Sequence, residues 1–346
     1  MTHPRFEHST IRHSNLIRHS SFVIRHSLPL AIVAALLAAC NEYHKPASPY
    51  IPPFSEVPDT HPTIDSPPQA YVRYAPERDD DIAWENDRTA FRIFGPELET
   101  AAPPFSSGID VWSKRGRNPV INTWYQQGEH SYHIDHGTGM DCYKVGASRG
   151  CGGIAVYNPD DHKYYVSHDW QSFSILNRGP REAVFQVTYA PWRVTTPTEK
   201  VENPGAPGRK VWQVTKFTLP IGSNLNRIET TLYSNEPGPI TVAIGLATHG
   251  ANDGLLWQQD SRMTFWDKAD RIPEDKNDNG YNGTALIVNP ANFQRFTQTA
   301  DDNLILLNVT PGKPFVYYAG ACWSNGPDFH SDTQWDHYIE TFDAKY

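Results

Sequence analysis

The segment AVFQVTY, residues 183–189, decides the fold class because every odd position in it is apolar. Alternation with a period of two places Ala183, Phe185, Val187 and Tyr189 on one face of a strand, which meets a core. Similar short runs recur along the chain between turns rich in Gly, Pro, Asn and Asp. The predicted strands span residues 89–94, 183–189, 211–219, 227–233, 241–247, 285–288, 304–309 and 315–321. The sequence therefore predicts an all-β fold, a large β-sandwich.

One helix is predicted near the C-terminus. Ser331 and Gln334 have the spacing of a capping box, in which two side chains satisfy the free amides of a helix start. An apolar stripe at helical spacing follows, made of Trp335, Tyr338, Ile339 and Phe342. We expect a short helix that packs on the sandwich and serves structure rather than chemistry.

Composition excludes several classes of protein. The 346 residues carry a formal net charge of -9, and no basic run interleaves with aromatic residues in the β-rich part, so no nucleic-acid partner is expected. The motifs of serine hydrolases, P-loop proteins and dinucleotide-binding folds are missing from the sequence. Aromatic residues make up 12% of the chain; most should fill the core, but such rings also form platforms in sugar-binding clefts.

The N-terminal part predicts a lipid anchor. Residues 1–27 form a low-complexity extension that repeats IRHS, and residues 28–39 form an apolar run of the length of a signal-peptide core. The run ends in Leu-Ala-Ala-Cys, the lipobox pattern of bacterial lipoproteins, in which Cys40 receives a diacylglycerol. We expect a lipoprotein of the bacterial cell envelope, periplasmic or on the outer surface, attached to the membrane through this lipid alone.

A proline-rich tether and a single domain are expected after the anchor. Residues 40–70 contain eight prolines, which keep a chain extended and prevent it from forming a central strand. Residues 71–346 carry the strand pattern and are predicted to form one β-sandwich domain.

Reactive side chains are concentrated in the segment YHIDHGTGMDCYKVGASRGCGG, residues 132–153. Glycines in this segment allow turns that other residues avoid, and loops of this kind on a rigid scaffold commonly carry function. The reactive residues are His133, Asp135, His136, Asp141, Tyr143, Lys144 and Arg149. We expect the active surface here; the alternative is a polar hairpin connection whose Asp and His only hold a turn.

Three segments resemble a known family. They are ENDRTAFRIFGP at residues 85–96, the segment at residues 132–153, and YYAGACWSNGPDFHSDTQWDHYIETF at residues 317–342. Together they resemble the bacterial family of unknown function DUF4861. The resemblance implies a β-supersandwich similar to galactose mutarotase and a role in polysaccharide degradation outside the cytoplasm, but it names no reaction.

Polysaccharide lyase chemistry, β-elimination across a uronic acid residue, fits the reactive side chains best. The reaction needs a base, an acid and a positive group that stabilises the enolate-like carboxylate. Tyr143 and His133 are the candidates for base and acid, Arg149 is the candidate cation, and Asp135 is expected to orient an imidazole. Replacing Tyr143, His133 or Arg149 is expected to lower turnover.

Three further residues are candidates for binding the acidic polysaccharide or oligosaccharide. Arg88 lies within the first resembling segment, and Lys144 adds a cation to the central one. His249 follows a strongly apolar predicted strand in the sequence LATHG and is also a candidate for a base at the rim of a cleft. For the histidine and the arginine, a structural role is the alternative.

A divalent metal such as calcium is the cofactor that the sequence leaves open. His136 and Asp141 could serve as ligands if the chain bends at Gly137. Asp275, Asn277 and Asn279 match the first half of a calcium loop, but Leu286 stands where a bidentate glutamate is required, so an EF-hand is excluded.

Two cysteines flank the central loop. Cys142 and Cys151 could close it as a disulfide in an oxidising compartment, and their spacing does not match a structural zinc site.

Two other functions remain open. The first is a lipoprotein that binds a carbohydrate without changing it. The second is a glycoside hydrolase that uses Asp135 and Asp141, which would require the two carboxylates to lie about 5 Å apart for a retaining mechanism.

Overall fold

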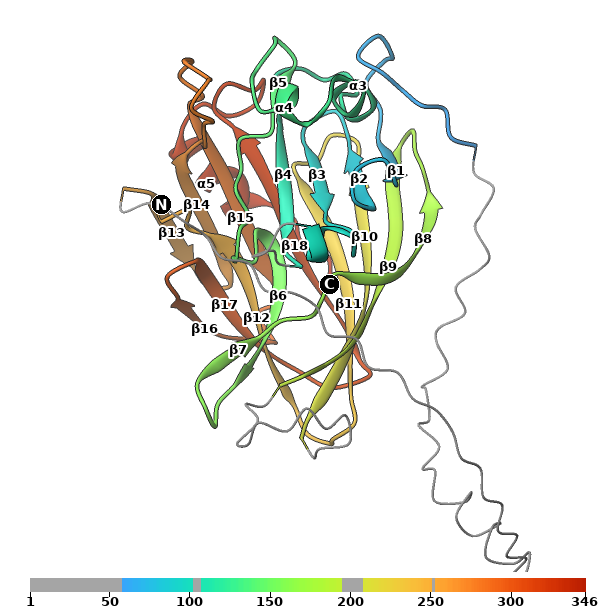
Figure 1. Ribbon diagram of the computed structural model, residues 1–346. Helices are drawn as coiled ribbons and strands as arrows, with labels where there is room; N and C mark the ends of the chain where they lie inside the picture. The colour runs from blue at the N-terminus through green and yellow to red at the C-terminus, as the bar shows by residue number, and fades with distance from the viewer. Residues whose placement is uncertain (1–57, 102–106, 195–207, 251–252) are drawn as a thin grey trace, which may run out of the picture. The chain divides into compact units, whose positions relative to one another are not determined.

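A computed structural model of the protein describes residues 58–101, 107–194, 208–250 and 253–346. The predictions for Cys40, the signal segment and most of the tether lie outside these residues. The described part consists mainly of antiparallel strands in three sheets, with a few short helices (Figure 1). Within these ranges, no helix is both long and apolar enough to cross a membrane.

The first sheet has five strands in chain order. They are β1 (Tyr71–Ala75), β2 (Asp81–Glu85), β3 (Ala90–Ile93), β4 (Ile109–Lys114) and β5 (Gly139–Met140). The short helix α2 (Leu98–Ala101) follows β3, while α3 (Ile121–Gln127) and α4 (Glu129–Tyr132) connect β4 to β5. Trp124 of α3 and Tyr132 of α4 pack on Trp112 of β4, so these two helices cover the outer face of the sheet.

The second sheet also has five strands. Its order is β16 (Phe293–Gln298), β17 (Asp302–Val309), β12 (Ile240–Ala247), β6 (Cys151–Asn158) and β7 (Lys163–Tyr165). A parallel bridge between Ile109 and Gly150 joins it to the first sheet. Gly150 has a φ of 59°, and a Cβ at this position would lie 2.1 Å from the carbonyl oxygen of Ile109, so the junction requires a glycine.

The third sheet has eight strands and faces the other two. Its order is β13 (Leu255–Gln259), β14 (Arg262–Lys268), β15 (Tyr281–Val288), β18 (Pro314–Trp323), β11 (Leu225–Ser234), β10 (Lys210–Pro220), β9 (Glu182–Arg193) and β8 (Trp170–Asn177). The layers share one core. In it, the ring of Trp84 in the first sheet packs on two rings of the third sheet, with centroid distances of 4.8 Å to Phe185 and 5.2 Å to Phe217. Each strand predicted from the sequence coincides with an observed strand.

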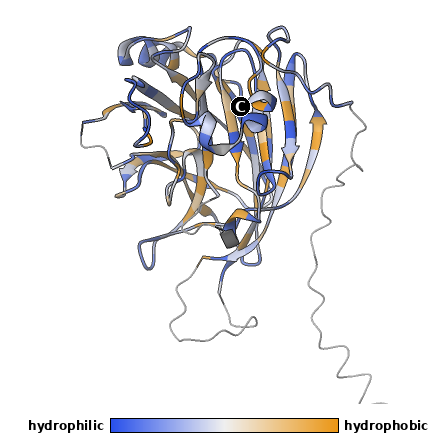
Figure 2. Ribbon diagram, turned by 45° about the horizontal axis from the view of Figure 1, so that its top comes forward, coloured by the Kyte–Doolittle hydropathy of each residue, from blue (hydrophilic) through white to orange (hydrophobic). Residues whose placement is uncertain are grey.

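The alternation that predicted the fold is visible in the strands themselves. Along β10 every second residue is buried, from Val211 to Leu219, and apolar segments recur along the strands in Figure 2. Helix α5 (Asp332–Thr341) begins after Ser331, whose hydroxyl accepts a hydrogen bond from the amide of Gln334. Trp335 and Ile339 bury their side chains on the outer face of the eight-stranded sheet. The predicted β-sandwich with a short C-terminal helix is therefore confirmed.

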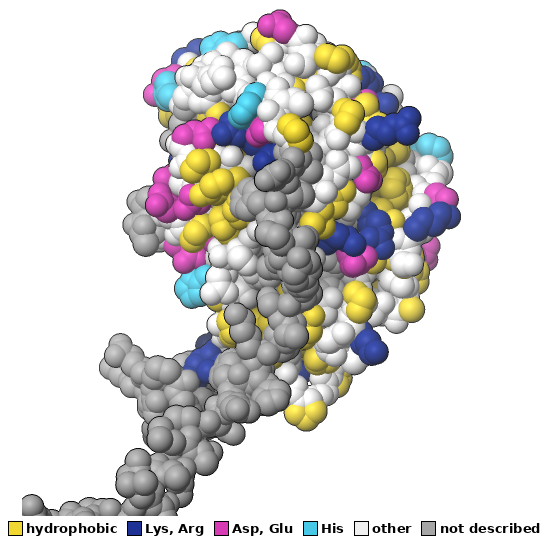
Figure 3. Space-filling view, turned by 90° about the vertical axis from the view of Figure 1, so that its right-hand side faces the viewer, with side chains coloured by type: hydrophobic (Ala, Val, Ile, Leu, Met, Phe, Trp, Pro, Cys, Tyr) yellow, Lys and Arg dark blue, Asp and Glu magenta, His cyan; other side chains and the backbone are white. Residues whose placement is uncertain are grey.

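The surface carries charges of both signs. On the face shown in Figure 3, the described basic and acidic side chains are interspersed among apolar and uncharged ones. The features that stand out lie instead inside the domain, where polar side chains are buried between and beneath the sheets.

Candidate functional site

The central segment, residues 132–153, contacts two different parts of the sandwich. Its first half follows α4 and contributes β5 to the first sheet, whereas its second half leads into β6 of the second sheet. The reactive residues predicted to converge are therefore divided between two places.

The first half carries His133 and Asp141 to a buried cluster around Arg92. The guanidinium donates to Asp110 at 2.9 and 2.6 Å, to Asp141 at 3.2 Å and to Asp81 at 3.4 Å. All four charged side chains are buried. His133 lies beside the cluster, with Nδ1 3.2 Å from the carbonyl oxygen of Asp141 and 3.7 Å from its carboxylate. We call this group the Arg92 cluster.

The carboxyl groups of the Arg92 cluster do not all ionise readily. Burial raises the pKa of Asp110, although Arg92 opposes the shift. The pKa of Asp141 is raised well above its usual range by burial and by the negative charge of Asp110. Burial also raises the pKa of Asp81 to about 6, against the effect of Arg92. Because one guanidinium faces three carboxyl groups in a poorly solvated place, the cluster is expected to retain a proton.

Asp135 shapes a turn rather than orienting an imidazole. Its carboxylate accepts a hydrogen bond from Arg115 at 2.6 Å and from the amides of Gly137 and Gly139 at 2.8 and 2.9 Å. These bonds outweigh the effect of burial and lower the pKa of Asp135. Among the described residues, no hydrogen bond joins Asp135 to a histidine, which differs from the predicted role. His136 is exposed in the same turn.

The proposed metal ligands are not assembled. In the described part of the chain, no group of three or more His, Cys, Asp or Glu side chains is placed to hold a metal ion. Asp141, paired with His136 in the prediction, contacts Arg92 instead. In the calcium-like segment, Asp275 accepts hydrogen bonds from the amide of Asn277 at 3.0 Å and the side chain of Asn279 at 2.9 Å, so the turn is held by its own polar groups.

The disulfide predicted between Cys142 and Cys151 is absent from the structure. The Cys142 sulfur lies 3.8 Å from the side-chain oxygen of Asn282, whereas the Cys151 thiol donates to the carbonyl oxygen of Gly320 at 3.2 Å. The two side chains belong to separate packing clusters, so they do not face each other. Burial raises the pKa of both thiols to about 12, which makes them poor nucleophiles.

The second half of the central segment places Tyr143 against His249. The two rings are perpendicular, at 89°, with centroids 4.5 Å apart. The Nδ1 atom of His249 lies 2.5 Å from a carboxylate oxygen of Asp267. Tyr143 precedes β6, His249 follows β12, and Asp267 lies near the end of β14, so the fold brings together three segments that are far apart in the sequence. We call these three residues the His249 site.

The His249 site contains polar atoms that the protein leaves without partners. Among the described residues, the Tyr143 hydroxyl, Nε2 of His249 and the second carboxylate oxygen of Asp267 are buried and make no hydrogen bond. Each such group destabilises a fold by about 1–3 kcal/mol. His249 also has a φ of 52°, a left-handed conformation that non-glycine residues rarely adopt. Unsatisfied atoms and strain at one place are typical of a functional site.

The hydrogen bond to Asp267 determines the protonation pattern of the imidazole. The Asp267 carboxylate accepts a hydrogen bond from Nδ1–H, so the neutral ring presents the lone pair of Nε2. Burial raises the pKa of Asp267, and the bond from His249 opposes this shift. Burial, with the nearby Cys151 and Asp267, raises the pKa of Tyr143 well above its usual range. The amide of Ala247 lies close enough to oppose this shift, but it donates its hydrogen bond to the carbonyl oxygen of Gly150 at 2.9 Å and leaves the phenol unpartnered. The site thus combines a base with a neutral phenol that can donate a proton.

His249 lines two adjoining hollows. The smaller has a volume of about 190 Å³ and is lined by residues 144–148 together with Ala247, Gly250 and Asp301. The larger has a volume of about 590 Å³ and extends over residues 267–271 and 276–279. Lys144 lines the first, and Lys268, Arg271 and Lys276 line the second, next to Asp270 and Asp278. The predicted binding residues Lys144 and His249 therefore border the same site.

Arg149 lies on the other face of the second sheet from Tyr143. Its amide donates to Asp302 at 2.6 Å, and its guanidinium donates to the carbonyl oxygens of Ala147 and Ser148 at 2.6 and 3.0 Å. Its Cβ packs against Gly245 on the outer face of β12, whereas the Tyr143 side chain lies in the core. The structure places Arg149 as a support of the turn, away from the position predicted for the catalytic cation.

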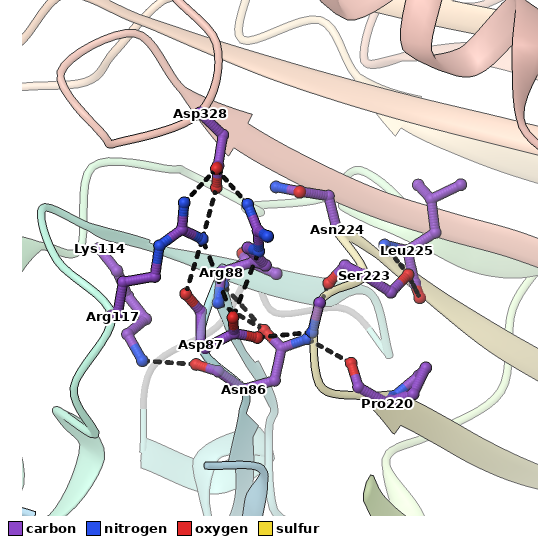
Figure 4. A network of polar contacts seen from close by, with 12 residues as sticks. Asn86, Asp87, Arg88, Lys114, Arg117, Pro220, Ser223, Asn224, Leu225 and Asp328 are labelled. Carbon is purple, nitrogen blue, oxygen red and sulfur yellow. Dashed lines mark hydrogen bonds and ion pairs between the residues drawn. The ribbon is translucent and has the colours of Figure 1, made fainter. Parts of the chain in front are cut away.

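Arg88 belongs to a separate ion-pair network (Figure 4). Arg88 and Arg117 both bind the carboxylate of Asp328, the latter at 2.6 Å, and Arg88 Nε lies 3.3 Å from Asp87. The neighbouring Lys114 is fully buried and donates to Glu85 at 2.7 Å and to the carbonyl oxygen of Asn86 at 2.6 Å. Arg88 therefore anchors the loop that precedes α5 and is occupied by protein carboxylates.

Asp267 was not identified from the sequence, although a signal for it exists. The segment MTFWDK, residues 263–268, is an apolar run that ends in a carboxylate, as the LATHG segment is an apolar run that ends in a histidine. Strand ends of facing sheets meet at the same edge of a sandwich, which would have paired these two residues. The strand itself was not among those predicted, so this signal was not used.

Comparisons with known proteins identify the family. Residues 55–346 match the model of the domain of unknown function DUF4861. The chain is 32% identical over 299 residues to uncharacterized protein P7 of Formosa agariphila, which covers 82% of this chain and 69% of that protein. A likeness to the galactosidase domain of the alpha-galactosidase-sucrose kinase AgaSK has 9% identity and a TM-score of 0.31, covering 73% of this chain and 42% of that one. The family match and the Formosa relative show that this chain belongs to the DUF4861 family.

Proposed function

We propose that this protein is an envelope lipoprotein that degrades uronate-containing polysaccharide or oligosaccharide by β-elimination, with His249 as the base. The observation that carries the proposal is the His249 site. Its imidazole is bound to a carboxylate and lines two hollows, and a neutral phenol packs against the imidazole from the core; both rings keep an unpartnered polar atom. Acid and base groups whose environments differ in this way are typical of proton-transfer catalysis.

The reaction can be assigned to these groups atom by atom. Nε2 of His249 takes the proton from C5 of the uronate, and Asp267 stabilises the resulting imidazolium. The electron pair of the C5–H bond forms the C4–C5 double bond as the C4–O bond breaks. The Tyr143 hydroxyl, which burial keeps protonated, donates its proton to the departing alkoxide oxygen, a much stronger base than a phenolate. No oxidant or other reactant is required.

A cation must make the C5 proton acidic by neutralising the uronate carboxylate. In place of Arg149, which supports a turn, Lys144 lines the smaller hollow beside His249. Lys268 and Arg271 line the larger hollow and are exposed, with no partner among the described residues. These side chains can approach an acidic sugar from two sides, and such electrostatic stabilisation commonly makes a large contribution to catalysis.

A panel of acidic polysaccharides provides the test. Elimination creates a conjugated enoate, which absorbs in the ultraviolet, whereas hydrolysis creates reducing ends without that absorbance. We expect His249→Gln to lower turnover by about 100-fold or more. The matched control is His133→Ala, which changes the histidine beside the Arg92 cluster and should retain turnover. Full activity of the His249 variant, or saturated products, would exclude the proposal.

A protein that only binds the glycan is the second candidate. It is favoured by the exposed cations Lys144, Lys268 and Arg271 at the two hollows, which can bind an acidic sugar without any proton transfer. Under this alternative the acidic oligosaccharides raise the unfolding temperature, but no product forms with any of them. The hydrolase alternative has less support, because Asp141 is buried against Arg92 and Asp135 is held by Arg115.

The envelope location rests on the lipobox at residues 37–40. Replacing Cys40 by Ser removes the thiol that would carry the lipid, so the variant should leave the membrane fraction. Retention of this variant in membranes would contradict the proposed anchor.

A further inference from the structure

Asn303 is a buried asparagine whose side chain has no partner. It lies on β17, is 1% exposed, and neither its amide nitrogen nor its carbonyl oxygen makes a hydrogen bond within the described residues. Buried amides are normally satisfied, because removing their atoms from water without replacement is unfavourable. Its cross-strand partner Leu246 and Ile305, the next residue on the same face of β17, are both apolar core residues, so the position would suit a leucine better if it served packing alone.

The strand register places Asn303 in the same part of the core as Tyr143. Leu246 of β12 is paired with Asn303 on one side and with Cys151 of β6 on the other. Residues directly opposite in antiparallel strands project to the same face, and Leu246 and Cys151 both point into the core between the sheets. Cys151 is also close enough to Tyr143 to affect its pKa. Asn303 is therefore on the side of the sheet that carries the Tyr143 phenol.

The unpartnered polar atoms of the His249 site and of Asn303 differ in the hydrogen bonds that they can form with a ligand. Nε2 of His249 and the free oxygen of Asp267 only accept hydrogen bonds in the state described above, so they disfavour a carboxylate. The Tyr143 hydroxyl and the Asn303 amide can both donate and accept. A sugar hydroxyl, which also donates and accepts, matches this set. A uronate carboxylate matches the lysine and arginine side chains of the outer hollows better.

We infer that Asn303 is a substrate-binding residue of the His249 site, which holds hydroxyl groups of the sugar while the carboxylate stays at the basic rim. The inference rests on the proposed function and deepens it by assigning the hydroxyl-bearing part of an acidic sugar to the interior. Asn303 acts by positioning the substrate and takes no part in proton transfer.

Stability measurements test whether the Asn303 side chain is dispensable for folding, as a residue that serves the substrate should be. Asn303→Leu replaces an unsatisfied amide by an apolar group of similar size, so its unfolding midpoint in denaturant should equal or exceed that of the wild type. Asn226→Leu is the matched control, since Asn226 is equally buried but accepts from Trp84 at 2.7 Å and donates to Ala319 at 3.2 Å. That variant should unfold at lower denaturant. A loss of stability in Asn303→Leu as large as in the control would overturn the inference.

Ligand measurements test whether Asn303 binds the sugar, with oligosaccharides from pectate, alginate and glucuronate-containing glycans as probes. The wild type should show a rise in unfolding temperature with one of them, and Asn303→Leu should lose most of this rise. Its kcat/KM should fall by about 30-fold or more, chiefly through KM. Asn303→Ser, which keeps a hydroxyl, should retain more activity than Asn303→Ala, and this pair carries the test if the leucine variant does not fold.

The outcomes separate the inference from the proposed reaction. If the wild type forms no unsaturated product, yet an oligosaccharide stabilises it and Asn303→Leu abolishes the stabilisation, the lyase proposal fails and the binding role of Asn303 stands. If Asn303→Leu retains both turnover and the ligand-induced shift, the amide serves an internal water only, and the inference is wrong even if the lyase activity is present.

Discussion

The Arg92 cluster and the His249 site are both buried and polar, but they differ in how completely the protein satisfies them. In the Arg92 cluster the guanidinium reaches all three carboxyl groups, and its face is covered by the Trp112 ring at 5.1 Å. In the His249 site, His249, Tyr143 and Asp267 each keep a polar atom without a partner among the described residues.

This difference separates a structural from a functional use of buried charge. Charged groups that are paired hold a unique arrangement of the chain, and removal of one partner leaves the others uncompensated. Groups that the protein leaves incomplete destabilise the fold, so a role in binding or catalysis explains their presence better than a role in stability. The Arg92 cluster and the His249 site both contain residues of the central segment. A high density of reactive residues in a sequence therefore does not identify the functional site by itself.

The largest effect is expected for the Arg92 cluster. Arg92→Leu removes the cation that faces Asp81, Asp110 and Asp141, and should lower the free energy of unfolding by about 3–5 kcal/mol, as measured by denaturant titration. The control is Arg115→Leu, which breaks the exposed pair with Asp135 and should lower it by about 1 kcal/mol or less. Equal losses of unfolding free energy in the two variants would show that the Arg92 cluster stabilises the fold no more than an exposed ion pair does.

A pH dependence of intermediate size follows from Asp81. Its pKa is about 6 in the folded protein and 3.8 in its unperturbed state, so the stability that it contributes is present below about pH 4 and is lost as the pH rises through 6. The loss should reach at most about 3 kcal/mol. In Asp81→Asn the group no longer titrates, and the curve of unfolding free energy against pH should be flatter between pH 4 and 7. An unchanged slope would show that Asp81 does not titrate in this range.

The smallest effect concerns Tyr143. Tyr143→Phe removes a buried hydroxyl without a partner, so the free energy of unfolding should stay the same or rise by up to about 1 kcal/mol, while lyase turnover falls. In the control Tyr317→Phe, the lost hydroxyl donates to the carbonyl oxygen of Gly152 at 2.8 Å, and stability should fall by about 1 kcal/mol. If both variants lose stability alike, the Tyr143 hydroxyl has a partner and the contrast between the two regions disappears.

The fold could be predicted from the sequence because local patterns decide it. Alternation in segments such as residues 183–189 and the capping box at Ser331 are readable from neighbouring residues. The short strands of the first sheet were largely missed, since β1 and β2 contain only five residues each. In addition, β2 is buried on both faces and β1 shows no regular alternation of buried and partly buried residues. The arrangement of the strands into three sheets depends on contacts between distant segments, which no local pattern contains.

The site could be predicted only in part. Tyr143, Lys144 and His249 were named from the sequence and lie together, because each stands beside a strand end or a glycine-rich turn. His133 and Arg149 could not be excluded from it, since only contacts between distant segments place His133 beside the Arg92 cluster and Arg149 against the outer face of β12. Asp267 and Asn303 were missed because strand residues within apolar runs are indistinguishable from core positions until the facing sheet is known.

The position of β18 has a consequence for how the chain reaches this fold. This strand comes last in chain order within the eight-stranded sheet, yet it lies between β15 and β11 and pairs with both. It therefore joins two halves of the sheet that are otherwise separate. Until residues 314–323 have left the ribosome, β11 and β15 each expose an unpaired edge, which is a template for pairing with other chains. A nascent chain that lacks this strand is therefore aggregation-prone, and cooperative folding of the sandwich is expected to begin only after residues 314–323 have been synthesised.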